Sequence, residues 1–237
     1  MELPPELRDM IYEMALTDVD GMSIASTTKN YRRTVCRIVN DDMEECRYRQ
    51  RGSRHRIPEG GNAPKQLATN LLAVSKQIHN ETINILYGQD FIFADTDTLH
   101  RFLTVIGARN QQRLRSIDVQ GFCTGRRTRA INHCAFMALV GATNLKSLII
   151  NNDEFRHYSS PKHLARGLYS NIHFFLEAYG AAHGRIDAAI DIIELEECAL
   201  DYFHSYRRGG VPAKQQTPEE NKVIFRAELC RLLGAKR

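Results

Sequence analysis

The chain has 237 residues, of which 43% are hydrophobic and 25% charged, and its 32 basic and 28 acidic residues leave a net charge of +4. This composition is ordinary for a globular protein and argues against a largely disordered chain. The positive charge is too small to identify a nucleic-acid-binding protein by itself. No apolar run approaches the roughly 20 residues that a transmembrane helix needs, so we expect no contact with a membrane.

The cysteines and the first residues indicate the compartment. The six cysteines are scattered along the chain, and none forms a CxxC pair. The opening residues lack the basic and apolar segments of a secretory signal. Reduced thiols in the cytoplasm or the nucleus explain this pattern most simply, and we expect neither a metal nor a cofactor.

The first predicted helix covers residues 3–16. Pro4 and Pro5 suit the first turn of a helix, where a missing N–H costs little. Apolar residues then recur at helical spacing, at Leu7, Met10, Ile11, Met14 and Ala15. Two interpretations of this stripe stay open: it packs on a later helix, or it forms a surface for a partner.

Residues 18–66 have a different character. Short strands are expected over residues 22–25 and 34–39, because β-branched and alternating residues occur there. A polar loop follows, in which five arginines fall within ten residues: Arg47, Arg49, Arg51, Arg54 and Arg56. We interpret this segment as a solvated loop; the alternative is an RNA- or ribonucleoprotein-associated factor that contacts phosphates through arginine-rich loops.

From residue 70 onward, helix and strand signals alternate. A helical segment over residues 70–88, either one helix or two joined near Asn80, precedes strands at 90–94, 115–119, 145–151 and 190–195. Helices are expected at 98–107, 130–141 and 160–179. Such alternation predicts parallel strands joined by crossover helices, and therefore an α/β protein with a mostly parallel sheet. No glycine-rich phosphate-binding motif follows any of these strands. A last helix is expected from Thr217 to Leu233.

Two segments of the sequence resemble the two halves of an F-box. LPPEL at residues 3–7, followed by Ile11-Tyr12-Glu13, resembles the first helix of that family. LLAVSKQI at residues 71–78, followed by Glu81-Thr82 and ILYG at 85–88, resembles its second half. The phrase ILYGQDFIFAD is similar to the junction found in a large group of fungal F-box-like proteins. Ser75 stands where the family usually has cysteine.

The resemblance implies a non-enzymatic protein-interaction module. Residues 1–88 would form an F-box-like helical lobe with an arginine-rich insertion at about 18–66. Residues 89–200 would form an irregular βα domain whose architecture resembles leucine-rich repeats. Residues 201–237 would form a tail with a C-terminal helix. F-box helices dock on a Skp-type adaptor of a ubiquitin ligase, while the second domain holds a substrate. The adaptor-facing residues would be Leu3, Pro4, Leu7, Ile11, Leu72 and Val74. If the insertion blocks docking, the helices serve only as a scaffold.

Overall fold

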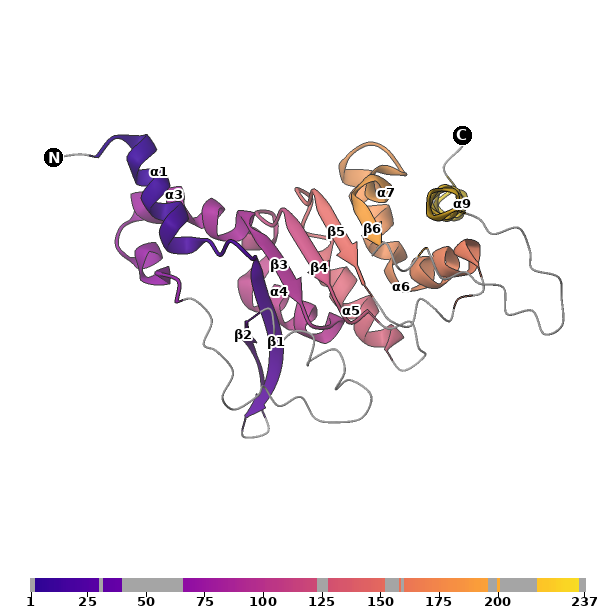
Figure 1. The fold of residues 1–237 in the computed structure, drawn as a ribbon, viewed down its shortest axis with the longest axis horizontal. Helices are drawn as coiled ribbons and strands as arrows, with labels where there is room; N and C mark the ends of the chain where they lie inside the picture. Colours follow the sequence, from indigo (N-terminus) through magenta and orange to yellow (C-terminus); the bar gives the residue numbers. More distant parts are fainter. Residues whose placement is uncertain are drawn as a thin grey trace.

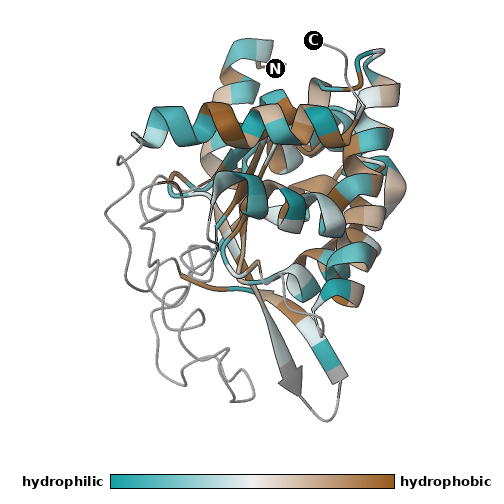
Figure 2. Cartoon of the chain, turned by 90° about the vertical axis from the view of Figure 1, so that its right-hand side faces the viewer, coloured by the Kyte–Doolittle hydropathy of each residue, from teal (hydrophilic) through white to brown (hydrophobic). Residues whose placement is uncertain are grey.

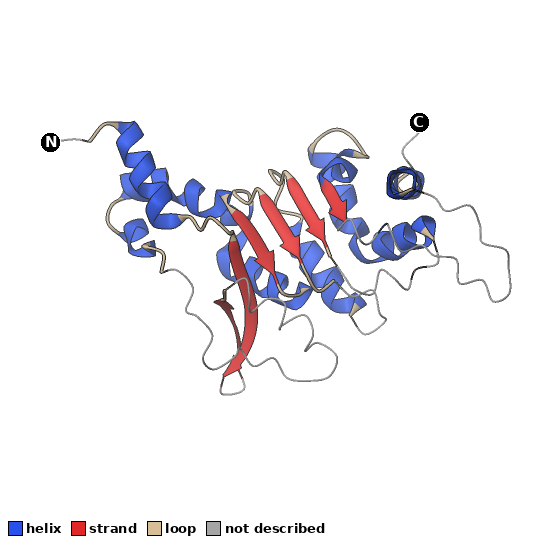
Figure 3. Cartoon of the chain, viewed as in Figure 1, coloured by secondary structure: helices blue, strands red, loops and turns tan. Residues whose placement is uncertain are grey.

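The computed structural model describes residues 3–29, 32–39, 66–122, 128–151, 158, 160–195, 200 and 217–234. Within these ranges, six strands form one sheet in the order β2-β1-β3-β4-β5-β6 (Figures 1 and 3). The expected α/β class and mostly parallel sheet are confirmed. A helical lobe lies at one end of the molecule and helix α9 at the other (Figure 1). Among the described helices, none has both the length and the apolar composition of a membrane span.

The N-terminal lobe consists of three short helical elements. Helix α1 covers Pro5–Leu16 and begins with proline in its first turn. The 3-10 helix η1 covers Thr69–Ala73, and helix α3 covers Lys76–Gly88. The Ser75 hydroxyl caps α3 by accepting a hydrogen bond from the Ile78 N–H at 3.1 Å. The expected helical segment at 70–88 is therefore interrupted at Ser75, because an extended N-cap residue begins a new helix there.

Five of the six strands are parallel neighbours, and one edge strand is antiparallel. Strands β3 (Asp90–Phe93), β4 (Ser116–Val119), β5 (Ser147–Ile150) and β6 (Ile193–Leu195) follow one another in sequence order. Strand β1 (Met22–Lys29) pairs in parallel with β3 and in antiparallel with β2 (Arg32–Arg37). The strands expected at the start of the insertion thus extend the same sheet as the βα units. The strand expected over 190–195 is shorter, because residues 188–192 form helix α7 (Ala188–Ile192).

Helices α4 (Thr96–Gln111), α5 (Arg129–Leu139) and α6 (Pro161–Ala182) follow β3, β4 and β5. Alternate strand residues such as Phe91, Ile117 and Leu148 are fully or almost fully buried, and they share one core with Leu99 of α4 and Phe136 of α5. In β3, β4 and β5 the intervening strand positions are half-buried or exposed. Figure 2 shows hydrophobic residues on the strands, behind helices whose surfaces carry both hydrophilic and hydrophobic residues. The helices therefore cover one face of the sheet.

A buried polar ladder connects the three large helices. The Thr96 hydroxyl donates to Asn132 Oδ1 at 2.8 Å, and Asn132 Nδ2 donates to Asn171 Oδ1 at 3.0 Å. All three side chains are buried, so each hydrogen bond replaces one that water would otherwise make. The ladder fixes α4, α5 and α6 against one another at their N-terminal halves.

Helix α9 (Pro218–Leu232) packs against α6 through an ion cluster. It begins with a capping box, in which Thr217 and Glu220 each bond to the other's backbone N–H. Glu228 is only 5% exposed and accepts hydrogen bonds from Arg166 of α6 at 2.8 Å and from Arg231 at 2.8 and 2.9 Å. These hydrogen bonds lower the pKa of the Glu228 carboxyl to about 2. The tail helix is therefore held to the βα part of the chain.

Candidate protein-binding site

Helix α1 carries its apolar stripe on the side that faces solvent. Leu7 is 46% exposed, Met10 57% and Met14 67%, whereas Tyr12 and Leu16 are buried. At 100° per residue, Met10 and Met14 lie about 200° from Tyr12, on the opposite side of the helix. Most of the stripe therefore does not pack on a later helix, although Ala15 is half-buried. Helix α1 contacts α3 through its other face.

A carboxylate on α3 determines this orientation. Glu81 accepts a hydrogen bond from the Tyr12 hydroxyl at 3.1 Å, and the Arg8 guanidinium lies 3.4 Å from the same carboxylate. Gln77 of α3 donates to it at 3.0 Å. Hydrogen bonds from Gln77 and Tyr12, together with the Arg8 charge, lower the pKa of Glu81. Burial raises the pKa of Tyr12, and the hydrogen bond to Glu81 raises it further.

These contacts explain why the apolar stripe faces outward. Arg8 and Tyr12 of α1 have a partner within the lobe, and Leu16 is fully buried. Exposed apolar residues at helical spacing then form one continuous surface. Contiguous apolar surfaces of this kind mark interaction sites more often than isolated exposed residues do.

A second apolar feature of the lobe lies where η1 meets α3. A shallow hollow of about 460 Å³ is lined by residues of both helices, including Leu72, Ala73 and His79. His79 Nδ1 lies 3.0 Å from the carbonyl oxygen of Leu72, which fixes η1 against α3. Val74, at the end of η1, is 64% exposed. This hollow adds a concave surface to the convex one that α1 provides.

The structure places the six predicted adaptor-facing residues in two groups. Leu3, Pro4, Leu7 and Ile11 are exposed on or just before α1, whereas Leu72 and Val74 lie in and after η1. Leu72 is half-buried and Val74 is exposed. The prediction omitted Met10 and Met14, which lie on the same outward face as Leu7. The helical spacing of Met10 and Met14 with Leu7 already indicates that the three residues share one face.

The alternative site is not described by the structure. Arg47, Arg49, Arg51, Arg54 and Arg56 all lie outside the described residues. Within the described ranges, no cluster of three or more His, Cys, Asp or Glu side chains has an arrangement that would hold a metal ion. Among the described cysteines, Cys36 and Cys134 carry thiols that form no disulfide. Among the predicted sites, the N-terminal lobe is the one that the structure describes.

Comparison with known proteins places the chain in a family without giving it an activity. No curated protein and no solved structure matches the chain. Residues 1–125 match a family described as a domain of unknown function (DUF7730). That match covers α1, the β1–β2 hairpin, α3, β3, α4 and β4. Since it extends over more than half of the sequence, the chain belongs to the DUF7730 family.

Proposed function

We propose that this protein is a non-enzymatic interaction module whose N-terminal lobe binds a Skp-type ubiquitin-ligase adaptor. The observation that supports the proposal is the outward direction of the α1 stripe, with Leu7, Met10 and Met14 between 46% and 67% exposed. The resemblance of residues 3–13 and 71–88 to an F-box supplies the identity of the partner. In this proposal the lobe is F-box-like and the βα part is an irregular repeat that carries a substrate.

The physical basis of binding would be burial of the exposed apolar side chains. Leu7 exposes nearly half of its surface, so covering it would contribute about 1 kcal/mol, half of the value for complete burial of a leucine. Acidic side chains at Glu6, Asp9 and Glu13 flank one edge of the stripe and stay accessible to solvent. They would form the polar rim that surrounds the apolar centre of a protein interface.

The test is a calorimetric titration of the full chain with the Skp-type adaptor of its host. Leu7→Asp and Val74→Asp should each weaken binding at least tenfold, because a carboxylate would be desolvated at the interface. Val223→Asp on α9 is a matched control, since Val223 and Val74 are both 64% exposed. It should leave binding unchanged.

Two results would contradict the proposal. One is the absence of binding by a wild-type protein whose thermal unfolding shows that it is folded. The other is binding that the Leu7 and Val74 variants retain while both remain folded. Either result would leave the helical lobe with a scaffold role only.

A further inference from the structure

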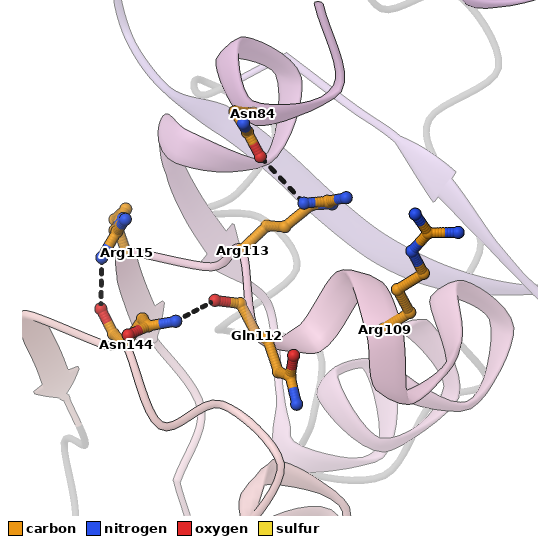
Figure 4. Close-up of a pocket in the computed structure, with 6 residues that line it drawn as sticks. All are labelled: Asn84, Arg109, Gln112, Arg113, Arg115 and Asn144. Atoms are coloured by element: carbon orange, nitrogen blue, oxygen red, sulfur yellow. Dashed lines mark hydrogen bonds between the residues drawn. The ribbon is translucent and has the colours of Figure 1, made fainter. Parts of the chain in front are cut away.

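A cleft rich in arginine lies at the amino ends of the parallel strands, next to the N-terminal lobe. Its volume is about 360 Å³. Its walls come from α3, from the end of α4 with the turn after it, and from the segments that lead into β4 and β5 (Figure 4). The lining residues are Asn84, Arg109, Gln112, Arg113, Arg115 and Asn144.

Neutral groups hold two of these arginines in place. Arg113 Nη1 donates to Asn84 Oδ1 at 2.9 Å, and Arg115 Nη1 donates to the Asn144 carbonyl oxygen at 3.2 Å. Asn144 Nδ2 in turn donates to the Gln112 carbonyl oxygen at 2.8 Å. Figure 4 shows these bonds. The acceptors orient the guanidinium groups without neutralising their charge.

The donors of the cleft are not all used. The Nε–H of Arg113 is buried and has no hydrogen-bond partner. A buried guanidinium donor without an acceptor is costly, because water cannot compensate for it.

The charge of the cleft is also uncompensated. Among the described residues, no carboxylate lines it and no acidic group forms an ion pair with Arg109, Arg113 or Arg115. Some arginines elsewhere in the described ranges are neutralised: Arg33 pairs with Asp97 at 2.7 Å, and Arg166 pairs with Glu228 at 2.8 Å. Three like charges around one hollow repel one another, and a bound anion would relieve that repulsion.

We infer that this cleft binds a phosphate group, carried by a small phosphomonoester or by a phosphorylated side chain of a protein. Guanidinium groups match phosphate oxygens in a bidentate geometry, and the dianionic charge suits a site with several arginines. The amide groups of Asn84 and Gln112 lie at the same walls and can contribute polar contacts. Among the described residues no aromatic side chain lines the cleft, so they provide no stacking surface of the kind that a single-stranded nucleic-acid site uses.

The inference is independent of adaptor binding and is tested without the adaptor. The full chain is titrated with inorganic phosphate and with O-phosphoserine at constant ionic strength, and binding is followed by calorimetry. Arg113→Gln and Arg109→Gln should each weaken phosphate binding about tenfold, as expected for the loss of a charged hydrogen bond. Arg109 is exposed, so its variant should fold even if the Arg113 variant does not.

Arg129→Gln is the matched control for loss of one positive charge. Arg129 lies on α5 outside the cleft, is exposed, and donates to the neutral Ser170 hydroxyl at 3.3 Å. It should bind phosphate as the wild type does. Saturable binding that is lost only in the cleft variants would support the inference. No saturable binding by the folded wild type, or equal binding by all variants, would overturn it.

A short phosphoserine peptide and its unphosphorylated form distinguish the two sources of phosphate. Tighter binding of the phosphopeptide than of O-phosphoserine would assign the site to a protein ligand. Equal affinities would assign it to the phosphate group alone and thus to small phosphomonoesters. The unphosphorylated peptide should not bind, and its binding at equal strength would contradict a phosphate site.

Discussion

Two positions on helix α1 test whether its apolar stripe is a surface. Met14 is 67% exposed and Leu16, two residues later, is fully buried. Met14→Lys should lower the free energy of unfolding by about 0.5–1 kcal/mol. Complete burial of a methionine side chain contributes roughly 1.5–3 kcal/mol, and only about a third of the Met14 side chain is buried. Methionine and lysine have similar helix propensities, so the backbone adds little. Leu16→Ala should cost about 2–5 kcal/mol, as other buried leucines do.

Urea denaturation of the wild type and both variants, followed by circular dichroism, measures the two costs. The slope of unfolding free energy against denaturant should stay constant, so the midpoints report stability directly. The reasoning is refuted if Met14→Lys destabilises the protein as much as Leu16→Ala does, because the stripe would then be packed. It is equally refuted if Leu16→Ala has no effect, because α1 would not be anchored to the lobe.

Three further predictions concern polar groups. Glu228→Gln should destabilise the protein by about 1–2 kcal/mol at neutral pH, a value reduced because solvent screens its exposed arginine partners. The pKa of Glu228 is lowered from 4.5 to about 2 in the folded protein, so this stabilisation is present above pH 4.5 and is lost as the pH falls toward 2. The thermal unfolding temperatures of the wild type and the variant should therefore converge near pH 2. Asn132→Ala should cost about 2–3 kcal/mol in urea denaturation, because it leaves buried partners on α4 and α6 unsatisfied. Tyr12→Phe should lower the free energy of unfolding by about 0.5–1.5 kcal/mol and speed amide hydrogen exchange in α1, because the hydrogen bond to Glu81 is lost. Unchanged exchange would show that this hydrogen bond does not hold the helix.

Local signals in the sequence were sufficient for most elements of the βα part. Asp95, Ser160 and Thr217 each cap a helix, and short apolar runs form the strands that follow or precede those helices. The start of the last strand was misplaced, because the apolar run from Ile190 suits a buried helical turn as well as a strand. Pairing of β1 with β3 joins residues about 70 positions apart, and local patterns carry no information on such contacts.

The direction of the α1 stripe could not be predicted from its period. The same spacing of apolar residues describes a helix that packs inward and one that binds a partner. The choice depends on Tyr12 and Glu81, which lie 69 positions apart in the chain. The arginine cleft was missed for a similar reason: Arg109 and Arg113 are near in sequence, but the amides at 84 and 144 that complete the cleft come from other elements.

Helix α3 connects the two proposed sites. Glu81 holds α1 from one turn of this helix, and Asn84, three residues later, holds Arg113 of the cleft. Residues three apart are neighbours on a helix surface, so both contacts depend on the position of the same part of α3. The outward face of α1 and the arrangement of the arginines therefore share one support. A ligand in the cleft would compete with Asn84 for Arg113, while the Glu81 contacts that orient α1 would remain. Binding at the two sites should consequently be nearly independent, although both rely on α3 for their geometry.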